Sequence, residues 1–427
     1  MEFVGKLIRL KEYIMGFNLG NIFKRQSKEQ ELFLALDIGT EYVKAVICSY
    51  KTNSQDICIE GYGKCRQNPN AMQGAMIINI ENVTKACEAS LSLAIQDAKN
   101  HSKSDKPMAL PKRVIIGIAG ELVRGITIIA DYEREAPQEK IIDKELKEVL
   151  RHIKEQAFDD AVTDIAEEIG VEPASLEEIN SKINATYIDG VKVDDPINFT
   201  GKNISYRVFS TFAPSLHVNS LKQVAKNLNL ELINIEVEPY AVARAINGGR
   251  LDGFDAVIID IGGGTTDVAL VKSGVILETK MFAYGGRVFT KRIAIDLKID
   301  LNKAEELKID YSKGKLGQKQ VGEIRKAILK DLSIWSEGLE LALKEVDGVD
   351  NYPTKIYLCG GASALEEMQT AIIEHPWLTV LPFTKFPKVE YLFPNQLDNI
   401  VDPTKTINDP SDVTPLALAR MYLENRS

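Results

Sequence analysis

The sequence predicts an α/β protein in which one unit occurs twice, with a smaller α+β segment inserted between the copies. The stretches LDIGTEYVKAVI (36–47) and AVIIDIGGGTTDVAL (256–270) both read as an apolar strand, an Asp-Ile-Gly turn with Thr, and a second apolar strand. The order β-β-β-α-β follows each stretch, so we predict an internal duplication. The segment at about 122–212 has a different composition.

The first copy is predicted from alternation and from short apolar runs that end at glycines. Val83, Cys87, Leu91 and Ala94 share one helix face. We expect two strands joined by a turn at Gly39 over 32–50 and a third strand over 56–63. A helix over 81–100 and a fourth strand over 113–120 should follow.

The second copy repeats this order. We expect a hairpin over 254–274 and a third strand over 274–283. A helix over 287–299 and a last strand that ends in glycines, over 355–363, should follow.

The segment between the copies differs from them in amino-acid composition and in hydrophobic periodicity. Residues 139–182 are rich in Glu, Lys and Asp with helical periodicity, which predicts a charged helix. Strands are expected at 185–193 and 204–213, around an Asp-Pro turn at 194–201. After them the chain returns to a helix at 216–229, the strand LELINIEVEP and a short helix after Pro239.

Composition narrows the function classes. The 427 residues carry a net charge of −9, which gives no general attraction for nucleic acid. The five cysteines form no CxxC pair, so neither a zinc site nor a disulfide framework is expected. No apolar run reaches the ~18 residues that a membrane-spanning helix needs. His217 and His375 are expected to be solvated or to cap helices, not to bind a ligand.

The N-terminal segment is basic although the rest of the chain is acidic. Phe3, Leu7, Leu10, Ile14 and Phe17 share one helix face, opposite charged residues. A basic amphipathic helix is typical of a segment that binds a membrane surface or a partner. Packing of this helix on the protein's own body is the alternative, and the sequence leaves both open.

The glycine turns predict a phosphate site. Gly262, Gly263 and Gly264 let backbone N–H groups approach an anion, and Thr265 and Thr266 add hydroxyl donors.

The aspartates in these turns predict a metal. Asp260 would repel a bare phosphate, so a Mg²⁺ ion with its water shell is expected between them. The turn of Asp37, Gly39 and Thr40 faces it from the other copy, and Asp37 and Asp260 are the expected metal carboxylates, through water.

Two other phosphate motifs are excluded. No GxxxxGK[ST] sequence exists, and a strand rather than a helix follows the glycines, unlike the dinucleotide fingerprint. A strained hairpin alone would explain three glycines, but the paired turn at Asp37 and the strand-glycine turn LCGGAS favour a nucleotide site.

These stretches resemble the two phosphate motifs and the adenosine motif of the actin/heat-shock-chaperone ATPase superfamily. VEPYAVARAI (237–246) resembles the segment that connects its two halves. The resemblance implies a duplicated actin-like, ribonuclease-H-like α/β fold that binds ATP and Mg²⁺. It implies that Glu238 contacts metal-bound water, with Asp37 and Asp260 as the other catalytic residues. The remaining implied nucleotide contacts are Lys44, Asp267, Gly285, Gly286, Glu305, Lys308, Gly360, Gly361, Ala362 and Ser363.

Within this superfamily the chain is most similar to the FtsA family of cell-division proteins. YIDGVKVDDPINFTGKNISYRV (187–208) resembles the hallmark of its inserted SHS2-type subdomain. Two departures are Lys44, which is placed as in PilM proteins of pilus assembly, and Arg292, where FtsA proteins usually carry an acidic residue. The chain stops at LALARMYLENRS without the usual C-terminal tail and membrane helix, so we expect Leu416, Leu418 and Met421 to be packed inside.

The resemblance implies a domain order and a function. The expected order is a basic segment 1–30, a first domain over 31–121, 213–250 and 384–427, an insertion 122–212, and a second domain 251–383. The implied role is a cytoplasmic protein on the inner face of the cell membrane that polymerises and tethers the tubulin-like division protein FtsZ. Other divisome proteins are further expected partners, residues 3–17 are a candidate membrane contact, nucleic acid is not expected, and ATP hydrolysis is at most weak. The alternative is a PilM-like ATP-binding adaptor of type IV pilus or secretion-system assembly; a sugar kinase or a chaperone is disfavoured.

Overall fold

The computed structural model describes residues 31–425 with gaps at 53, 102–108, 120–122, 247–252 and 347. The chain divides into two units, Met1–Glu31 and Leu32–Ser427, and the account below concerns the second. The helix predicted over 3–17 lies outside the described residues.

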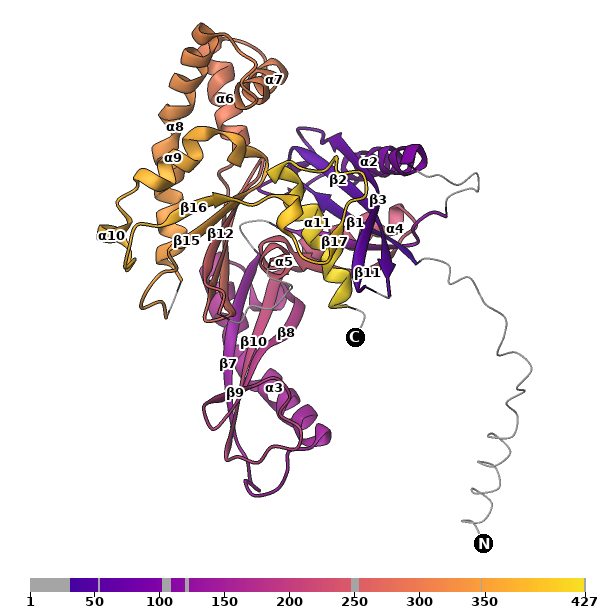
Figure 1. The fold of residues 1–427 in the computed structure, drawn as a ribbon, viewed down its shortest axis with the longest axis vertical. Helices are drawn as coiled ribbons and strands as arrows, with labels where there is room; N and C mark the ends of the chain where they lie inside the picture. Colours follow the sequence, from indigo (N-terminus) through magenta and orange to yellow (C-terminus); the bar gives the residue numbers. More distant parts are fainter. Residues whose placement is uncertain are drawn as a thin grey trace, which may run out of the picture. The chain divides into compact units, whose positions relative to one another are not determined.

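The first half is built on a six-stranded sheet in the order β11-β6-β1-β2-β3-β17 (Figure 1). Its central strands are apolar on both faces because helices cover them on both sides. The strands are β1 (Leu32–Ile38), β2 (Tyr42–Lys51), β3 (Asp56–Arg66), β6 (Arg113–Ile118), β11 (Glu231–Val237) and β17 (Ile400–Val401), with the small pair β4 (Met72–Gln73) and β5 (Met76–Ile77). The helices are α2 (Ile80–His101), α4 (Ser215–Asn227), α5 (Glu238–Ala245) and α11 (Val413–Arg420).

The second half belongs to a nine-stranded sheet in the order β16-β15-β12-β13-β14-β7-β10-β8-β9. Its own strands are β12 (Ala256–Ile261), β13 (Thr266–Lys272), β14 (Val275–Phe282), β15 (Lys355–Cys359) and β16 (Lys388–Tyr391). Its helices are α6 (Gly286–Leu297), α7 (Leu301–Ser312), α8 (Gln318–Lys344), α9 (Glu366–Glu374) and α10 (Trp377–Val380). Short 3₁₀ turns lie at Pro173–Ser175 (η2), Gly361–Ala364 (η4), Pro394–Gln396 (η5), Pro410–Asp412 (η6) and Met421–Leu423 (η7).

The two sheets repeat one topology. The order β11-β6-β1-β2-β3 matches β16-β15-β12-β13-β14 strand for strand. In both, the first strand of the unit is antiparallel to the next and parallel to the strand on its other side. The predicted duplication is confirmed.

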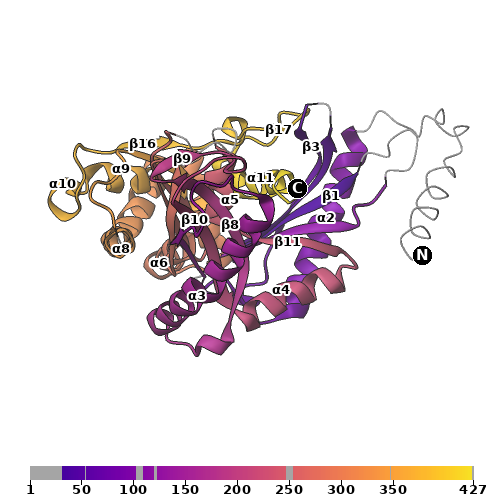
Figure 2. The same ribbon diagram turned by 90° about the horizontal axis from the view of Figure 1, so that it is seen from below.

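The inserted segment continues the second sheet. It consists of β7 (Arg124–Glu133), α3 (Asp143–Ile169), β8 (Leu176–Ile188), β9 (Val191–Val193) and β10 (Asn203–Pro214). Figure 2 shows α3 beside β8 and β10. Strand β7 joins β14 through Ile126 opposite Glu278 and Gly125 opposite Thr279. A Cβ on Gly125 would lie 2.5 Å from Thr279 Oγ1, so this approach requires glycine.

The single charged helix predicted over 139–182 is wrong in its second part. Helix α3 ends at Ile169 because Gly170 adopts a left-handed conformation (φ 70°) that caps it. From Leu176 the chain is strand β8.

The described residues form three apolar cores. The first packs around the first-half sheet and extends onto one face of β12, β13 and β14, the second lies on the opposite face of these strands, and the third lies between α3 and the inserted strands. The C-terminal residues Leu416, Leu418 and Met421 are buried in the first core, as predicted. The Tyr422 ring stacks on Phe33 with centroids 4.1 Å apart, which fixes the end of the chain to β1.

Among the described residues, no helix combines the length and the apolar character that crossing a membrane would take.

Candidate functional site

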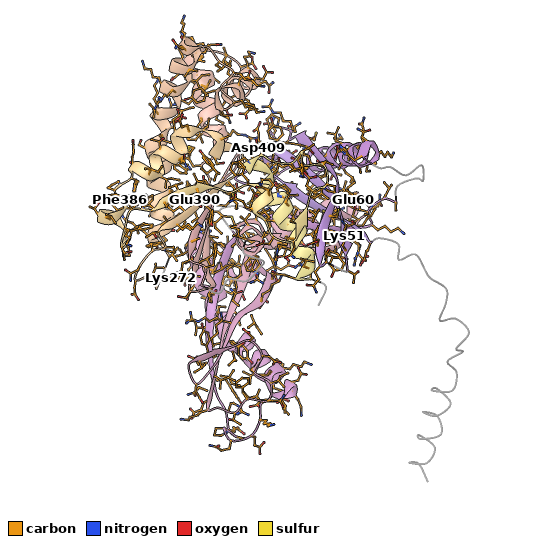
Figure 3. All side chains as sticks on the ribbon, viewed as in Figure 1. Lys51, Glu60, Lys272, Phe386, Glu390 and Asp409 are labelled. Carbon is orange, nitrogen blue, oxygen red and sulfur yellow. The ribbon has the colours of Figure 1, made fainter. Side chains whose placement is uncertain are left out.

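A cavity of about 460 Å³ is lined by turns and helix ends of both halves, a volume usual for small-molecule sites. Asp409 also lines it and lies where the two halves meet (Figure 3). The predicted site residues that line it are Asp37, Gly39, Thr40, Lys44, Glu238, Asp260, Gly262, Gly263, Gly264, Thr265, Asp267, Gly286, Glu305, Lys308, Gly360, Gly361 and Ala362.

Thr266, Gly285 and Ser363 are not among the lining residues but support the walls. The Thr266 hydroxyl donates to the Tyr284 carbonyl (2.7 Å) and accepts from the Trp335 indole (2.9 Å). The Ser363 hydroxyl donates to the Gly360 carbonyl (2.7 Å). A Cβ on Gly285 would lie 2.7 Å from the Gly262 oxygen, so the absence of a side chain allows close packing.

In the first half, the turn places Asp37 opposite Lys44 on the neighbouring strand. Lys44 Nζ lies 3.0 Å from Asp37 and donates to the Ser411 carbonyl at 2.6 Å. Burial opposes the charge, but the Asp37, Asp412 and Asp260 carboxylates raise the pKa of Lys44. The Asp37 carboxylate therefore has a cationic partner.

In the second half, the same register places Asp260 opposite Asp267. Asp260 accepts from the Thr414 hydroxyl, and Asp267 Oδ2 accepts from Thr265 at 3.3 Å. Asp267 Oδ1 is buried with no hydrogen-bond partner in the described structure. Burial raises the pKa of both aspartates, and for Asp267 the Asp260 charge adds to this effect.

Glu238 is the first residue of α5 and is buried at the cavity wall. Burial raises its pKa, and the Asp37, Asp267 and Asp260 carboxylates raise it further. A Cβ on Gly117 would lie 2.6 Å from Glu238 Oε1, so this glycine of β6 makes room for the carboxyl group.

The glycine turn is held by backbone hydrogen bonds to the start of α6. Gly262 N–H donates to the Thr265 carbonyl (2.9 Å) and closes the turn. Gly286 N–H donates to the Gly262 carbonyl (2.9 Å), and Arg287 N–H to that of Gly263 (2.7 Å). These bonds satisfy orphan donors of the helix and fix the turn against it.

Gly360 directly follows β15 and has φ 88° and ψ 163°, a region that only glycine occupies readily. A Cβ there would lie 2.0 Å from Asp260 Oδ1. This glycine therefore leaves room for the carboxylate.

Glu305 and Lys308 lie one turn apart on α7 and are both buried. Lys308 Nζ lies 2.8 Å from Glu305 and donates to the Gly286 carbonyl (2.9 Å) and to Thr290 (2.7 Å). The pair ties α7 to the start of α6 at the cavity.

Several lining residues were missed by the sequence reasoning. Lys64 lies opposite Lys44 on β3, and Ser411 and Thr414 come from the C-terminal segment, which carries no motif. Glu41 and Arg287 directly follow predicted site residues. Extending the two motifs by one residue would have found these last two.

The prediction that His217 is solvated or capping is wrong. Its side chain is buried on α4 and lines the cavity, and its Nδ1 has no hydrogen-bond partner in the described structure. Burial lowers the pKa of His217 to about 4, so the imidazole is neutral near pH 7.

Arg292, the residue that departs from the usual acidic one, is not a lining residue. Its guanidinium holds both oxygens of Asp331 at 2.8 Å. The pair joins α6 to α8 within the second half.

Four buried carboxyl groups share the cavity wall, those of Asp37, Asp260, Asp267 and Glu238, and of these Asp37 is paired with an ammonium group, that of Lys44. In the described part of the chain, no three His, Cys, Asp or Glu residues are arranged to ligate a metal directly. The excess negative charge and the unpartnered Asp267 oxygen fit a hydrated divalent cation.

Sequence comparisons find similarity to several FtsA proteins. The model of the family "Cell division protein FtsA" matches residues 257–409. FtsA of Neisseria meningitidis is 26% identical over 299 residues, which cover 70% of this chain and 65% of that protein. FtsA of Pseudomonas aeruginosa is 23% identical, and the match covers 66% of this chain and 61% of that protein. The chain thus spans somewhat under two thirds of the length of these relatives.

A solved structure titled "PilM-PilN type IV pilus biogenesis complex" has a similar fold. The TM-score is 0.61 at 17% identity, and the match covers 92% of this chain and 98% of the other. The fold is therefore the duplicated actin-like α/β architecture with an insertion. The resemblance indicated by the motifs is confirmed: the chain is similar to FtsA proteins and has the actin-like fold.

Proposed function

We propose that the chain is an ATP-binding, actin-like scaffold of bacterial cell division. The observation that carries the proposal is the cavity between two facing turns, with Asp37 on one and Asp260 on the other. The similarity to FtsA proteins supports the cellular role.

The residues present fit Mg²⁺-ATP. The turn glycines expose backbone to phosphate, and Asp37 and Asp260 would hold the hydrated ion. When bound, the ion supplies charge neutralisation of the phosphates. Glu305, Lys308 and the Gly360–Gly361 turn would contact the nucleoside.

Any hydrolysis would rest on Glu238, whose raised pKa reflects a buried carboxyl group. In the ionised state this group orients water by accepting its hydrogen bond. With Asp37, Asp260 and Asp267 neutralised, Glu238 would ionise at a lower cost, because these carboxylates are the charges that raise its pKa. We expect slow turnover because burial and the neighbouring carboxylates disfavour the ionised form of Glu238.

We further propose that nucleotide-bound copies assemble into filaments at the inner face of the cell membrane. FtsZ and other divisome proteins are the proposed partners, and the basic residues 3–17 are the proposed membrane contact.

Calorimetry with Mg²⁺-ATP tests the nucleotide site. We expect Asp260→Ala to weaken Mg²⁺-dependent affinity by about 100-fold, or about 2.7 kcal/mol. The same titration in EDTA is the control. An unchanged affinity in Asp260→Ala would remove the basis of the proposal.

Electron microscopy of the full chain with Mg²⁺-ATP on anionic lipid vesicles tests the scaffold. Filaments on the vesicles support it. A chain lacking residues 1–28 is expected to lose vesicle binding, and equal co-sedimentation of both chains contradicts the membrane contact.

A PilM-like adaptor is the second candidate, favoured by the fold similarity over 92% of the chain. The two candidates differ in the peptide bound. Capture of the C-terminal peptide of FtsZ supports the division role, whereas capture of a pilus-assembly N-terminal peptide supports the adaptor.

A further inference from the structure

Arg287 crosses from the second half to the first at the rim of the cavity. Its side chain starts at the second residue of α6, where its own N–H is bound to Gly263. The guanidinium donates to Glu41 Oε2 through Nε (3.0 Å) and Nη2 (2.9 Å), and Nη2 also donates to the Thr40 carbonyl at 2.7 Å. Both acceptors belong to the β1–β2 turn of the first half.

The Glu41 carboxylate also takes part in a second link between the two halves. Glu41 Oε1 accepts from Arg66 Nε (3.1 Å) and Nη2 (3.0 Å). Arg66 Nη1 then donates to Asn302 Oδ1 at 3.0 Å, at the start of α7 in the second half. One carboxylate with two guanidinium partners thus links both halves twice.

The backbone beneath these pairs is close-packed. A Cβ on Gly263 would lie 2.8 Å from Glu41 Cβ, and one on Gly264 would lie 2.7 Å from Thr40 Oγ1. The two turns therefore touch directly below the ion pairs. Glu41 is only 15% exposed and Arg287 23%, so solvent screens this pair less than a surface pair.

We propose that Arg287 and Glu41 form a latch that holds the two halves closed and slows the release of bound nucleotide. The proposal rests on the nucleotide function proposed above. Because both halves line the cavity, a ligand enclosed there leaves when the halves separate. Separation breaks the charge-assisted bonds of Arg287 to Glu41 and Thr40, and that of Arg66 to Asn302.

Direct contact of Arg287 with phosphate is the competing explanation, since Arg287 also lines the cavity. The two explanations predict opposite effects of removing the Glu41 charge. A latch weakens without Glu41, whereas a phosphate-binding guanidinium is released from a competing carboxylate and binds better.

Arg292 supplies a matched control on the same helix. It forms a bidentate pair with Asp331 that stays within the second half and does not cross the cavity. Arg292→Ala therefore removes a comparable ion pair from α6 without touching the latch.

Stopped-flow dissociation of a fluorescent ATP analogue with Mg²⁺ is the test. We expect Arg287→Ala and Glu41→Gln each to raise the dissociation rate about 10-fold, and the double variant to add little beyond either. Arg292→Ala should change it less than twofold. Faster release in Arg287→Ala with unchanged or slower release in Glu41→Gln overturns the latch and assigns Arg287 to the phosphates.

Amide hydrogen exchange of the nucleotide-free protein provides a readout that does not need ATP. The latch predicts faster exchange at residues 40–42 and 262–265 in Arg287→Ala and Glu41→Gln, and not in Arg292→Ala. Unchanged exchange in both variants overturns the latch. Lack of nucleotide binding by the unmodified chain instead contradicts the proposed function, and the exchange result still decides the latch.

Discussion

The two halves of the chain place an aspartate at the same point of the same hairpin, but the residue opposite differs. Asp37 faces Lys44, whereas Asp260 faces Asp267. The first hairpin therefore carries a compensated ion pair and the second a carboxylate pair. The two hairpins thus share their strand order but not their charge pattern. The uncompensated carboxylates lie on the second half, and a bound cation would offset their charge.

The largest expected effect comes from the strand ends next to these hairpins. Strand β15 is followed by Gly360 with a positive φ, while the equivalent β6 is followed by Ala119, which has no positive φ. We expect Gly360→Ala to lower the free energy of unfolding by about 4 kcal/mol, since it adds backbone strain and a clash with Asp260. Urea denaturation measures the loss. The control Ala119→Gly should cost about 1 kcal/mol or less, and equal effects would contradict the asymmetry.

Breaking the ion pair of the first hairpin should come next. Lys44→Met leaves Asp37 buried without its cation, and we expect a loss of about 3 kcal/mol in unfolding free energy. Lys64→Met is the matched control, because Lys64 lies opposite Lys44 but is exposed, and should cost less than about 1 kcal/mol. Similar losses in both variants would show that the Asp37 pair contributes little.

The pH dependence of the unfolding free energy tests the burial of His217 in the first half. His217 has a lowered pKa of about 4, so the folded state binds fewer protons than the unfolded state between about pH 6.5 and 4. Stability is present above pH 6.5 and is lost as the pH falls towards 4, by up to about 3 kcal/mol. In His217→Leu this loss should vanish, as followed by denaturation at each pH. The exposed His101→Leu should keep the wild-type profile, and a loss retained in His217→Leu would assign the pH dependence to other groups.

The smallest expected change in unfolding free energy concerns the pair Asp260 and Asp267, and here the substitution should stabilise the protein. Asp267→Asn removes one of two buried like charges, so we expect the nucleotide-free protein to gain about 1 to 2 kcal/mol at pH 7. Because burial raises the pKa of Asp267, the wild type loses stability as the pH rises above the unfolded-state pKa, and the gain should grow with pH. Thermal unfolding over a pH series measures it.

Asp37→Asn provides the opposite case. It removes the partner of Lys44 and should destabilise the chain. If both substitutions changed stability in the same direction, the two hairpins would be electrostatically alike, and the comparison would fail.

The sequence predicted the duplicated topology because each hairpin couples two apolar strands to a glycine turn, a local signal. Most of the site residues that it predicted do line the cavity, since the turns themselves form part of the cavity wall. The burial of Leu416 and Leu418 followed from their apolar character at the chain end.

The remaining features depend on contacts between distant segments. The Lys44–Ser411 bond joins residues 367 positions apart, and no local pattern reports it. His217 has an ordinary amphipathic helix context, so only the tertiary structure places it at the cavity. The long helix predicted over 139–182 ignored Gly170, whose left-handed conformation stops α3.

The seam between β7 and β14 has a mechanical consequence. The insertion is joined covalently to the first half at both its ends, yet two rungs, at Ile126 and Gly125, attach it to the sheet edge of the second. It thereby also shields an edge strand that would be open to pairing with other chains. If the two halves rotate relative to each other, either the β7–β14 pairing must break or the insertion must move together with the second half. A protein docked on the insertion would then sense the angle between the halves without touching the nucleotide.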